Sequence, residues 1–212
     1  MSRYGMSIDL NIDCGRLDRI VTEQTCSTFS AIREMYARNV YLRLFDVARI
    51  TWQAGIDAGG NRGMFTVFLS QLCRDVVYIE PQLHFRQALQ LLLRDNPSSC
   101  KVHIENLFLG GAKAPGFITV PEILSKYGLS RVTLCKFDVE GAEFDVFLGD
   151  SSWLKSVDNI AMEVHGRAGN PHVLVDTLVA CGFRVTARDA SLRPVDPGHA
   201  DYICASRTGA LL

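Results

Sequence analysis

A glycine-rich turn between an apolar segment and an amphipathic one constrains the fold of this chain more than any other feature. Residues 54–58 predict a short buried strand, Gly59, Gly60 and Gly63 follow it, and from Met64 apolar residues recur at helical spacing. Glycine adopts positive φ readily and lets a ligand approach the backbone. The first N–H groups of a helix are also free to donate to a ligand. The segment therefore predicts a strand, a nucleotide-type binding turn and a helix.

The chain continues to alternate between strand and helix after this turn. The predicted strands are 54–58, 76–80, 101–106, 132–139, 159–165, 183–188 and 202–206. The predicted helices are 62–73, 83–95, 120–127, 142–148 and 171–181. Such alternation indicates an α/β fold, a parallel sheet covered by helices on both faces. Because 189–201 shows no helical pattern, the last strand must run antiparallel to its predecessor. We therefore predict a doubly wound, seven-stranded, mostly parallel sheet.

The first 50 residues precede this alternation and follow a different pattern. Residues 1–21 show no sustained period and predict a loose arm or a short hairpin. Residues 22–49 carry an apolar stripe and predict a long helix, in which Asn39 marks a point of separation into two. We expect residues 1–50 to form an N-terminal arm and helical lid, within the same domain as a Rossmann-like core at residues 51–212.

Composition narrows the class of protein. Hydrophobic residues make up 48% and charged residues 21% of the 212, which is ordinary for a globular protein. A net charge of −1 gives no basic field, so we expect no nucleic-acid or membrane partner. No apolar run approaches the roughly 18 residues that span a bilayer. We also expect no secretory signal, because the N-terminal residues lack the basic segment and long apolar block of one. Seven cysteines without a Cys-x-x-Cys pair predict reduced, buried, structural thiols in a cytoplasmic protein.

Polar residues follow the predicted strands at the edge where open parallel sheets bind their ligands. Glu80 lies 17 residues beyond Gly63, where an acid commonly accepts hydrogen bonds from a ribose diol. Glu105 and Asn106 end the next strand, and we predict that they line the same cofactor site. The structural alternative for Glu80 is a cap or first-turn charge on the helix that follows it.

Asp57 determines which nucleotide the turn favours. An acid beside a dinucleotide's pyrophosphate would be repulsive, whereas a carboxylate can pair with an α-ammonium group. The pattern Asp-x-Gly-Gly-x-x-Gly, in which Asn61 is a further predicted contact, therefore favours a cationic adenosine ligand over NAD. S-adenosylmethionine carries an ammonium and a sulfonium and fits this expectation. A turn-forming role for Asp57 is the alternative.

Asp138 and His165 are the candidate catalytic residues. Asp138 ends an apolar strand, and an unpaired buried carboxylate is costly, so it should meet a ligand or cap the next helix. His165 ends the neighbouring strand and should stand beside it, where an imidazole can take a proton near neutral pH. We expect Glu140 and Glu143 to satisfy backbone or neighbouring charges. Asp138 and Glu140 could hold magnesium, because carboxylates are its preferred ligands. Since no tight Asp-Asp pair appears, we predict that the protein uses no metal.

Four stretches, taken together, resemble successive motifs of the FkbM family of methyltransferases. They are Ile-Asp-Ala-Gly-Gly-Asn-Arg-Gly-Met-Phe-Thr, Tyr-Ile-Glu-Pro, Cys-Lys-Phe-Asp-Val-Glu-Gly-Ala-Glu and Met-Glu-Val-His, in that order between Ile56 and His165. The resemblance implies a class I S-adenosylmethionine-dependent fold and, most often, O-methylation of a hydroxyl on a sugar, glycan or secondary metabolite. It implies a cofactor loop and ribose acid at Asp57, Gly59, Asn61, Gly63 and Glu80, and strand-end motifs at Asp138, Glu140 and His165.

The chain departs from the family pattern in two places. The family usually has alanine where Gly60 stands, and residues 107–120 are short where an extra hairpin is expected. Acceptor specificity should lie in residues 1–50, 107–120 and 189–200, with a small molecule or glycan as the acceptor. The apolar N-terminal helix is equally suited to a homodimer contact.

Two other classes of function share this type of sheet. An NAD(P)-dependent oxidoreductase would need glycine in place of Asp57, and no tyrosine here precedes a lysine at the Tyr-x-x-x-Lys spacing. A non-catalytic binding module could keep the fold without the chemistry. The acids at positions 57, 80 and 138 argue against it.

Overall fold

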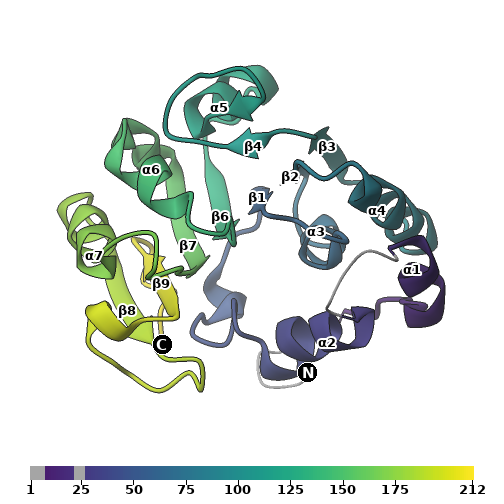
Figure 1. Cartoon of the computed structure of the whole chain (residues 1–212), viewed down its shortest axis with the longest axis horizontal. Helices are drawn as coiled ribbons and strands as arrows, with labels where there is room; N and C mark the ends of the chain where they lie inside the picture. Colours follow the sequence, from purple (N-terminus) through teal and green to yellow (C-terminus); the bar gives the residue numbers. More distant parts are fainter. Residues whose placement is uncertain (1–7, 22–26) are drawn as a thin grey trace.

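The computed structural model describes residues 8–21 and 27–212. The strands of the main sheet are β1 (Ala54–Ala58), β2 (Asp75–Ile79), β3 (Lys101–Glu105), β6 (Val132–Phe137), β7 (Val157–Glu163), β8 (Arg184–Arg188) and β9 (Tyr202–Ser206). They form one seven-stranded sheet in the order β3-β2-β1-β6-β7-β9-β8 (Figure 1). The first five are parallel, and β9 runs antiparallel to both β7 and β8. The predicted mostly parallel, doubly wound sheet with an antiparallel last strand is confirmed.

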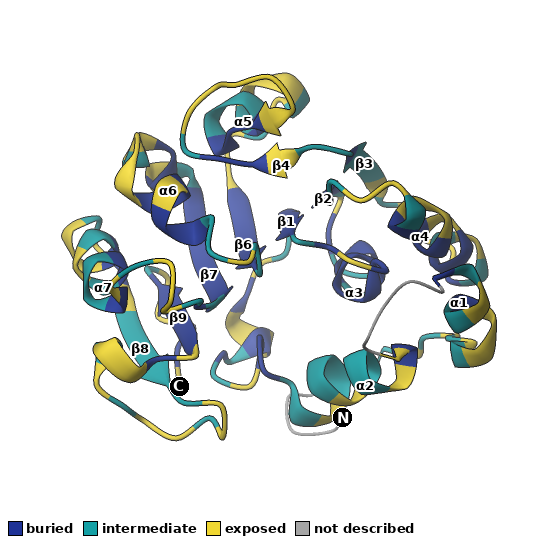
Figure 2. Ribbon diagram, viewed as in Figure 1, coloured by how far each residue is buried: buried dark blue, intermediate teal, exposed yellow. Residues whose placement is uncertain are grey.

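Helices cover both faces of this sheet. They are α1 (Cys14–Ile20), α2 (Thr28–Ile32), α3 (Met64–Ser70), α4 (His84–Asp95), α5 (Val120–Tyr127), α6 (Glu143–Leu148) and α7 (Pro171–Ala180). The last three pack on one face, and α3 and α4 cover the other together with the N-terminal segment (Figure 1). The central strands are buried on both faces (Figure 2). This is why their sequences read as nearly continuous apolar runs.

Alternation along the central strands decides which residues reach the second face. Ile56 and Ala58 of β1 join the core under α5, α6 and α7, so Asp57 between them points to the opposite face. The same argument places Lys136 of β6 on that opposite face, because Cys135 and Phe137 join the first core. Two charged side chains on neighbouring strands thus project from the same face.

The N-terminal segment differs from both predictions made for it. Residues 14–20 form helix α1 and not a loose arm, because Asp13 caps the helix by accepting from Arg16 N (3.0 Å) and Leu17 is buried. The predicted long helix is short: α2 continues only as a π-helical turn, Arg33–Arg38, and stops at Asn39, whose φ is 54°. The first residues of that predicted helix, 22–26, lie outside the described residues.

The apolar stripe that favoured a helix is instead buried by tertiary contacts. Beyond Asn39 the chain forms turns and a short 3₁₀ segment, Val47–Arg49. In this stretch Val40, Tyr41 and Phe45 pack into the core of the second face. Backbone hydrogen bonds from Asp46 N to Ala210 O (2.7 Å) and from Leu212 N to Leu44 O (2.9 Å) tie it to the C-terminal residues. Packing therefore outweighed helical periodicity here.

The segment after β3 is reduced, as its length suggested. It contains two two-residue strands, β4 (Phe108–Leu109) and β5 (Phe117–Ile118), which pair in parallel and not as a hairpin. Their exposed rings at Phe108 and Phe117 lie with centroids 5.4 Å apart.

The thiols only partly match the prediction. All six cysteines in the described part of the chain are free, but Cys14, Cys100 and Cys181 are only half-buried. Cys26 falls outside that part. Among the described helices, none combines the length and apolar character needed to cross a membrane.

Candidate active site

The glycine turn after β1 is held in place by backbone contacts on two sides. Gly59 N and Gly60 N both donate to Ile79 O, at 2.9 and 3.1 Å. Gly59 has φ 71°, and a Cβ on it would lie 1.7 Å from the carbonyl oxygen of Asp138. Gly63 has φ 86°, and a Cβ there would lie 2.4 Å from Leu89. These two glycines are required by conformation and by space.

Tyr78 explains why Gly60 stands where alanine is expected. A Cβ on Gly60 would lie 2.3 Å from the Tyr78 ring, and the Tyr78 hydroxyl donates to Asn61 O at 2.5 Å. The ring therefore occupies the space that a methyl group would need, and its hydroxyl anchors the turn through this hydrogen bond. Gly60 and Tyr78 act as a size-matched pair.

Gly60→Ala should therefore destabilise the protein by about 1–3 kcal/mol, because the buried ring must move. Urea unfolding of the two proteins measures this difference in free energy. Gly15→Ala is the matched control: its Cβ would meet no atom closer than 3.6 Å, and it lies in α1, where alanine is favoured. Equal unfolding free energies for wild type and Gly60→Ala would contradict the size-matched pair.

Glu80 faces the glycine turn from the end of β2. Its Oε2 accepts from Asn61 N and its Oε1 from Gln82 N, both at 3.0 Å. Burial raises the pKa of Glu80, and the two N–H donors partly offset that effect. Each carboxylate oxygen can still accept a second hydrogen bond. Glu80 thus binds backbone N–H groups of the turn and of Gln82, but it does not cap the next helix, since the N-cap of α4 is Leu83 and no side chain caps it. Contact between Glu80 and a ribose stays a prediction.

Glu105 and Asn106 are placed differently from each other. Glu105 Oε1 accepts from Tyr127 Oη (2.6 Å) and Lys126 Nζ (2.5 Å), so its carboxylate ties β3 to α5. Asn106 Nδ2 donates to Glu80 O at 3.2 Å and lies beside the turn's acid. The geometry favours Asn106 over Glu105 as a cofactor contact.

Asp57 and Lys136 form a fully buried ion pair under the turn. Lys136 Nζ lies 3.3 Å from Asp57 Oδ1 and donates to Gly59 O at 2.7 Å, while Thr66 Oγ1 donates to Asp57 Oδ2 at 2.7 Å. Burial lowers the pKa of Lys136, but Asp57 and Asp138 outweigh it and the net shift is upward. The ammonium that Asp57 faces in this structure is thus the protein's own. Direct contact between Asp57 and a ligand ammonium stays a prediction.

Sequence reasoning missed Lys136, although a signal was present. A lysine inside the apolar strand Cys-Lys-Phe must either pair or lose its charge when it is buried. That requirement could have linked it to an acid on the neighbouring strand.

Asp138, Glu163 and His165 meet at the ends of β6 and β7. One ligand atom from each lies within 4.8 Å of the others, so His165 does stand beside Asp138 as expected. Tyr41 of the N-terminal segment bridges the two acids, its Oη lying 3.1 Å from Asp138 Oδ2 and 3.3 Å from Glu163 Oε2. Burial, reinforced by Asp138 and Glu34, raises the pKa of Glu163 to about 7. Glu163 was given no role from sequence, although it stands in the Met-Glu-Val-His motif.

His165 is held by a buried glutamate. Glu143 Oε1 accepts from His165 N at 2.6 Å and lies 3.0 Å from its Nδ1, and the exposed Glu140 lies 3.4 Å from Nε2. The hydrogen bond to Glu143 raises the pKa of His165 to about 9, despite the opposing effect of burial. At pH 7 the ring is therefore mainly an imidazolium. This disfavours the predicted role of His165 as proton acceptor and suits it to donate to a substrate.

The pairing of His165 with Glu143 should make stability depend on pH. Because the pKa is raised from 6.5 to about 9 on folding, the stabilisation is complete below pH 6.5 and is lost as pH rises through 9. The difference in unfolding free energy between wild type and His165→Gln should therefore shrink between these values. Urea titrations across that range measure it. In a Glu143→Gln background the pH dependence should disappear, and its persistence would contradict the pairing.

The same three side chains at the ends of β6 and β7 are of the kind that can hold a divalent cation. The prediction that no metal is needed can be checked directly. We expect methyl transfer to be unchanged after dialysis against EDTA and unaffected by added magnesium. Loss of turnover with EDTA and recovery with magnesium would overturn this prediction.

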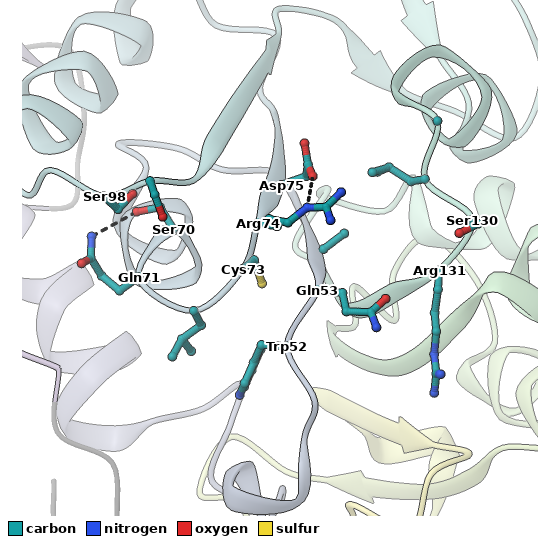
Figure 3. A pocket seen from close by; sticks show the side chains of 15 residues that line it. Trp52, Gln53, Ser70, Gln71, Cys73, Arg74, Asp75, Ser98, Ser130 and Arg131 are labelled. Atoms are coloured by element: carbon teal, nitrogen blue, oxygen red, sulfur yellow. Dashed lines mark hydrogen bonds and ion pairs between the residues drawn. The ribbon is translucent and has the colours of Figure 1, made fainter.

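A cavity lies at the opposite end of the sheet from these acids. It has a volume of about 750 Å³ and is bordered by Trp52, Arg74, Asp75 and Arg131, near the amino-terminal ends of β1, β2 and β6 (Figure 3). Ligands of open parallel sheets bind at the carboxyl-terminal ends, where the glycine turn and the acids lie. None of the predicted site residues borders this cavity.

Comparison with known proteins agrees with this fold. Residues 108–185 match the methyltransferase FkbM domain, a range that contains the strand-end motifs around Asp138 and His165. The resemblance seen in the sequence is confirmed over this range, since residues 108–185 match the model of the methyltransferase FkbM domain.

Particular relatives extend the comparison. The AMB antimetabolite synthetase AmbE of Pseudomonas aeruginosa is 38% identical over 97 residues, which are 39% of this chain but only 5% of that protein. The structure of WbdD superposes with a TM-score of 0.56 at 13% identity, over 90% of this chain and 47% of that one. Precorrin-6y C5,15-methyltransferase from Geobacter metallireducens superposes with a TM-score of 0.52 at 14% identity, over 93% and 98%. At such identities the two structures share the fold alone.

Proposed function

We propose that this chain is an S-adenosylmethionine-dependent O-methyltransferase that acts on a hydroxyl of a small molecule or glycan. One observation carries the proposal. The glycine turn with Glu80 lies at the ends of β1 and β2, and Asp138 with Glu163 lies at the ends of the adjoining β6 and β7. A cofactor subsite and a proton-accepting subsite thus stand side by side at the edge where such sheets bind ligands.

The residues at the turn suit S-adenosylmethionine. A Cβ on Gly59 would collide with Asp138 O, so the turn and the end of β6 already approach as closely as backbone allows. The turn's backbone, the Glu80 carboxylate and the Asn106 amide would hold the nucleoside part of the cofactor. When bound, S-adenosylmethionine supplies a methyl group activated by its sulfonium. The protein's own contribution is mainly to position the acceptor.

The acids at the ends of β6 and β7 can accept the proton that the acceptor's hydroxyl loses on methylation. A hydroxyl beside Asp138 and Glu163 can pass its proton to a carboxylate, and Tyr41 holds both acids in position. Glu163 is the better acceptor, because a base with a pKa near the working pH is the most effective one. His165, charged and fixed by Glu143, is suited to orient the acceptor's oxygen.

Isothermal titration of the full chain tests the cofactor. We expect S-adenosylhomocysteine to bind and NAD not to bind, and Glu80→Gln to weaken binding by about 10- to 100-fold through the lost charge-assisted hydrogen bonds. Asp176→Asn, a change at an exposed acid on α7, is the matched control and should bind like wild type. Tight binding of NAD without binding of S-adenosylhomocysteine would support an oxidoreductase instead.

Turnover separates an enzyme from a binding module. Release of S-adenosylhomocysteine should be measured across a panel of hydroxylated small molecules and glycans. Binding of the cofactor with no release for any acceptor would favour the module that kept the fold and lost the chemistry.

A further inference from the structure

Tyr41 brings the N-terminal segment into the site at the ends of β6 and β7. Its side chain is buried, and its ring packs edge-on against Phe65, with centroids 5.5 Å apart, and against Tyr202, with centroids 6.4 Å apart. Phe65 belongs to α3, the helix that follows the glycine turn, and Tyr202 belongs to β9. The ring is therefore fixed between the helix of the predicted cofactor subsite and the sheet, and its hydroxyl has little freedom to move.

The Tyr41 hydroxyl has one hydrogen to donate and two carboxylates beside it. Its Oη lies 3.1 Å from Asp138 Oδ2 and 3.3 Å from Glu163 Oε2. Burial raises the pKa of Tyr41 well above its usual range, so the hydroxyl keeps its hydrogen. A hydrogen bond to a charged carboxylate stabilises the charged form, so the acid that does not receive it is left as the stronger base. The direction of this one hydrogen bond thus separates the roles of the two acids.

The surroundings of the two acids differ in the same sense. Lys136 Nζ lies 3.7 Å from Asp138 Oδ2, the same oxygen that Tyr41 approaches, and keeps that carboxylate charged. Glu163 forms no such ion pair with any basic side chain in the described part of the chain, and the neighbouring His165 is engaged by Glu143 at 3.0 Å. Charged oxygens are the stronger hydrogen-bond acceptors. The Tyr41 hydrogen should therefore go to Asp138.

The Tyr41 oxygen is then free to serve Glu163 in the opposite sense. A phenol oxygen can accept a hydrogen bond while its own hydrogen is donated elsewhere. Burial raises the pKa of Glu163 to about 7, so its carboxyl group readily holds a proton at neutral pH. A protonated Glu163 can donate to Tyr41 Oη, which in turn donates to Asp138. This directed chain of hydrogen bonds stabilises the proton on Glu163 and the charge on Asp138.

We propose that Tyr41 is a positioning residue that makes Glu163, and not Asp138, the base of the reaction. It donates to Asp138 throughout, and its oxygen accepts from Glu163 once Glu163 has taken the proton. The acceptor's O–H bond breaks as its oxygen takes the methyl group, whose former bonding electrons stay on the sulfur, and the proton bonds to Glu163. The inference rests on the proposed function for the reaction, and it adds the residue that assigns the two acids their roles.

Double-mutant cycles test the direction of the hydrogen bond without any turnover. Free energies of unfolding in urea at pH 7 are measured for the full chain and for Tyr41→Phe, Asp138→Ala, Glu163→Ala and the two double variants that contain Tyr41→Phe. We expect Tyr41→Phe to be clearly non-additive with Asp138→Ala and nearly additive with Glu163→Ala. A larger coupling with Glu163, or none with Asp138, would overturn the proposal.

Turnover tests the positioning role itself. With the hydroxylated compound that gives the fastest release of S-adenosylhomocysteine as acceptor, Tyr41→Phe should lower kcat by about 10- to 100-fold, because the two acids lose their common contact. The acceptor's KM and the affinity for S-adenosylhomocysteine should change by less than about threefold. Tyr36→Phe is the matched control, since it removes a hydroxyl of the same segment that donates to Met64 O, and it should keep kcat. An unchanged kcat in Tyr41→Phe, or an equal loss in Tyr36→Phe, would refute the role.

Two readouts keep this proposal apart from the proposed function. Thermal melting and titration with S-adenosylhomocysteine show whether Tyr41→Phe is folded and keeps its cofactor site. If wild type turned over an acceptor and Tyr41→Phe were equally fast, only the positioning role would fail. If wild type turned over no acceptor, the methyltransferase would fail, and the role of Tyr41 in its reaction would fail with it. The double-mutant cycles would still establish where the hydrogen of Tyr41 goes.

Discussion

Replacing Glu163 with glutamine is expected to lower kcat for methyl transfer by about 10²- to 10⁴-fold at neutral pH, the usual contribution of a positioned proton acceptor. Glutamine keeps the shape and can still accept from Tyr41, but it cannot take a proton from the acceptor's hydroxyl. In wild type, kcat should rise as pH passes through about 7, where Glu163 loses its proton. The Glu163→Gln variant should lose this dependence. Initial rates of S-adenosylhomocysteine release from pH 5.5 to 8.5 measure both effects.

A second acid on the same strand provides the control. Asp158 lies at the opposite end of β7, where it pairs with Arg131 at 2.7 Å, and Asp158→Asn should leave kcat unchanged. Asp138→Asn tests which of the paired acids is the base. If that variant lost the rise near pH 7 while Glu163→Gln kept both the rise and the rate, the proton would belong to Asp138.

Lys136→Met should destabilise the protein by about 3–5 kcal/mol, because it leaves the carboxylate of Asp57 buried without its counter-ion. Both side chains are excluded from solvent, so water cannot replace the lost ammonium. The hydrogen bond that supports Gly59 O is lost as well. Urea unfolding followed by circular dichroism measures the difference in free energy.

The double variant Asp57→Asn/Lys136→Met separates charge from packing. It removes both charges and keeps an acceptor for Thr66, so it should recover much of the lost stability. Lys113→Met, at a side chain that is 86% exposed, is the control and should change stability by less than about 0.5 kcal/mol. A double variant as unstable as Lys136→Met would show that the loss comes from packing.

The strand ends show how far local patterns reach into the site. Glu80, Asp138 and His165 could each be assigned to the end of a strand, since apolar runs and breaker residues define where buried strands stop. Their partners could not be assigned. Tyr41 reaches Asp138 and Glu163 although it lies 97 and 122 residues away from them in the chain. Lys136 meets Asp57 only because β6 lies next to β1 in the sheet.

In the N-terminal segment, a local pattern predicted a structure that long-range packing replaced. Its apolar residues predicted a helix through residue 49, yet Asn39 turns the chain and Val40, Tyr41 and Phe45 pack on the sheet. Apolar periodicity indicates that side chains are buried, but it does not indicate which part of the protein they pack against. Tertiary packing can therefore override a weak helical preference.

Short-range signals in the sequence were therefore sufficient for the glycine turn, the alternation of strand and helix, and the antiparallel last strand, because these depend on neighbours along the chain. The ion pair under the turn, the orientation of His165 by Glu143 and the contacts of Tyr41 with the two acids depend on strand order and on long-range packing. Such contacts form between residues that are distant in sequence, and they arise only once the sheet is assembled.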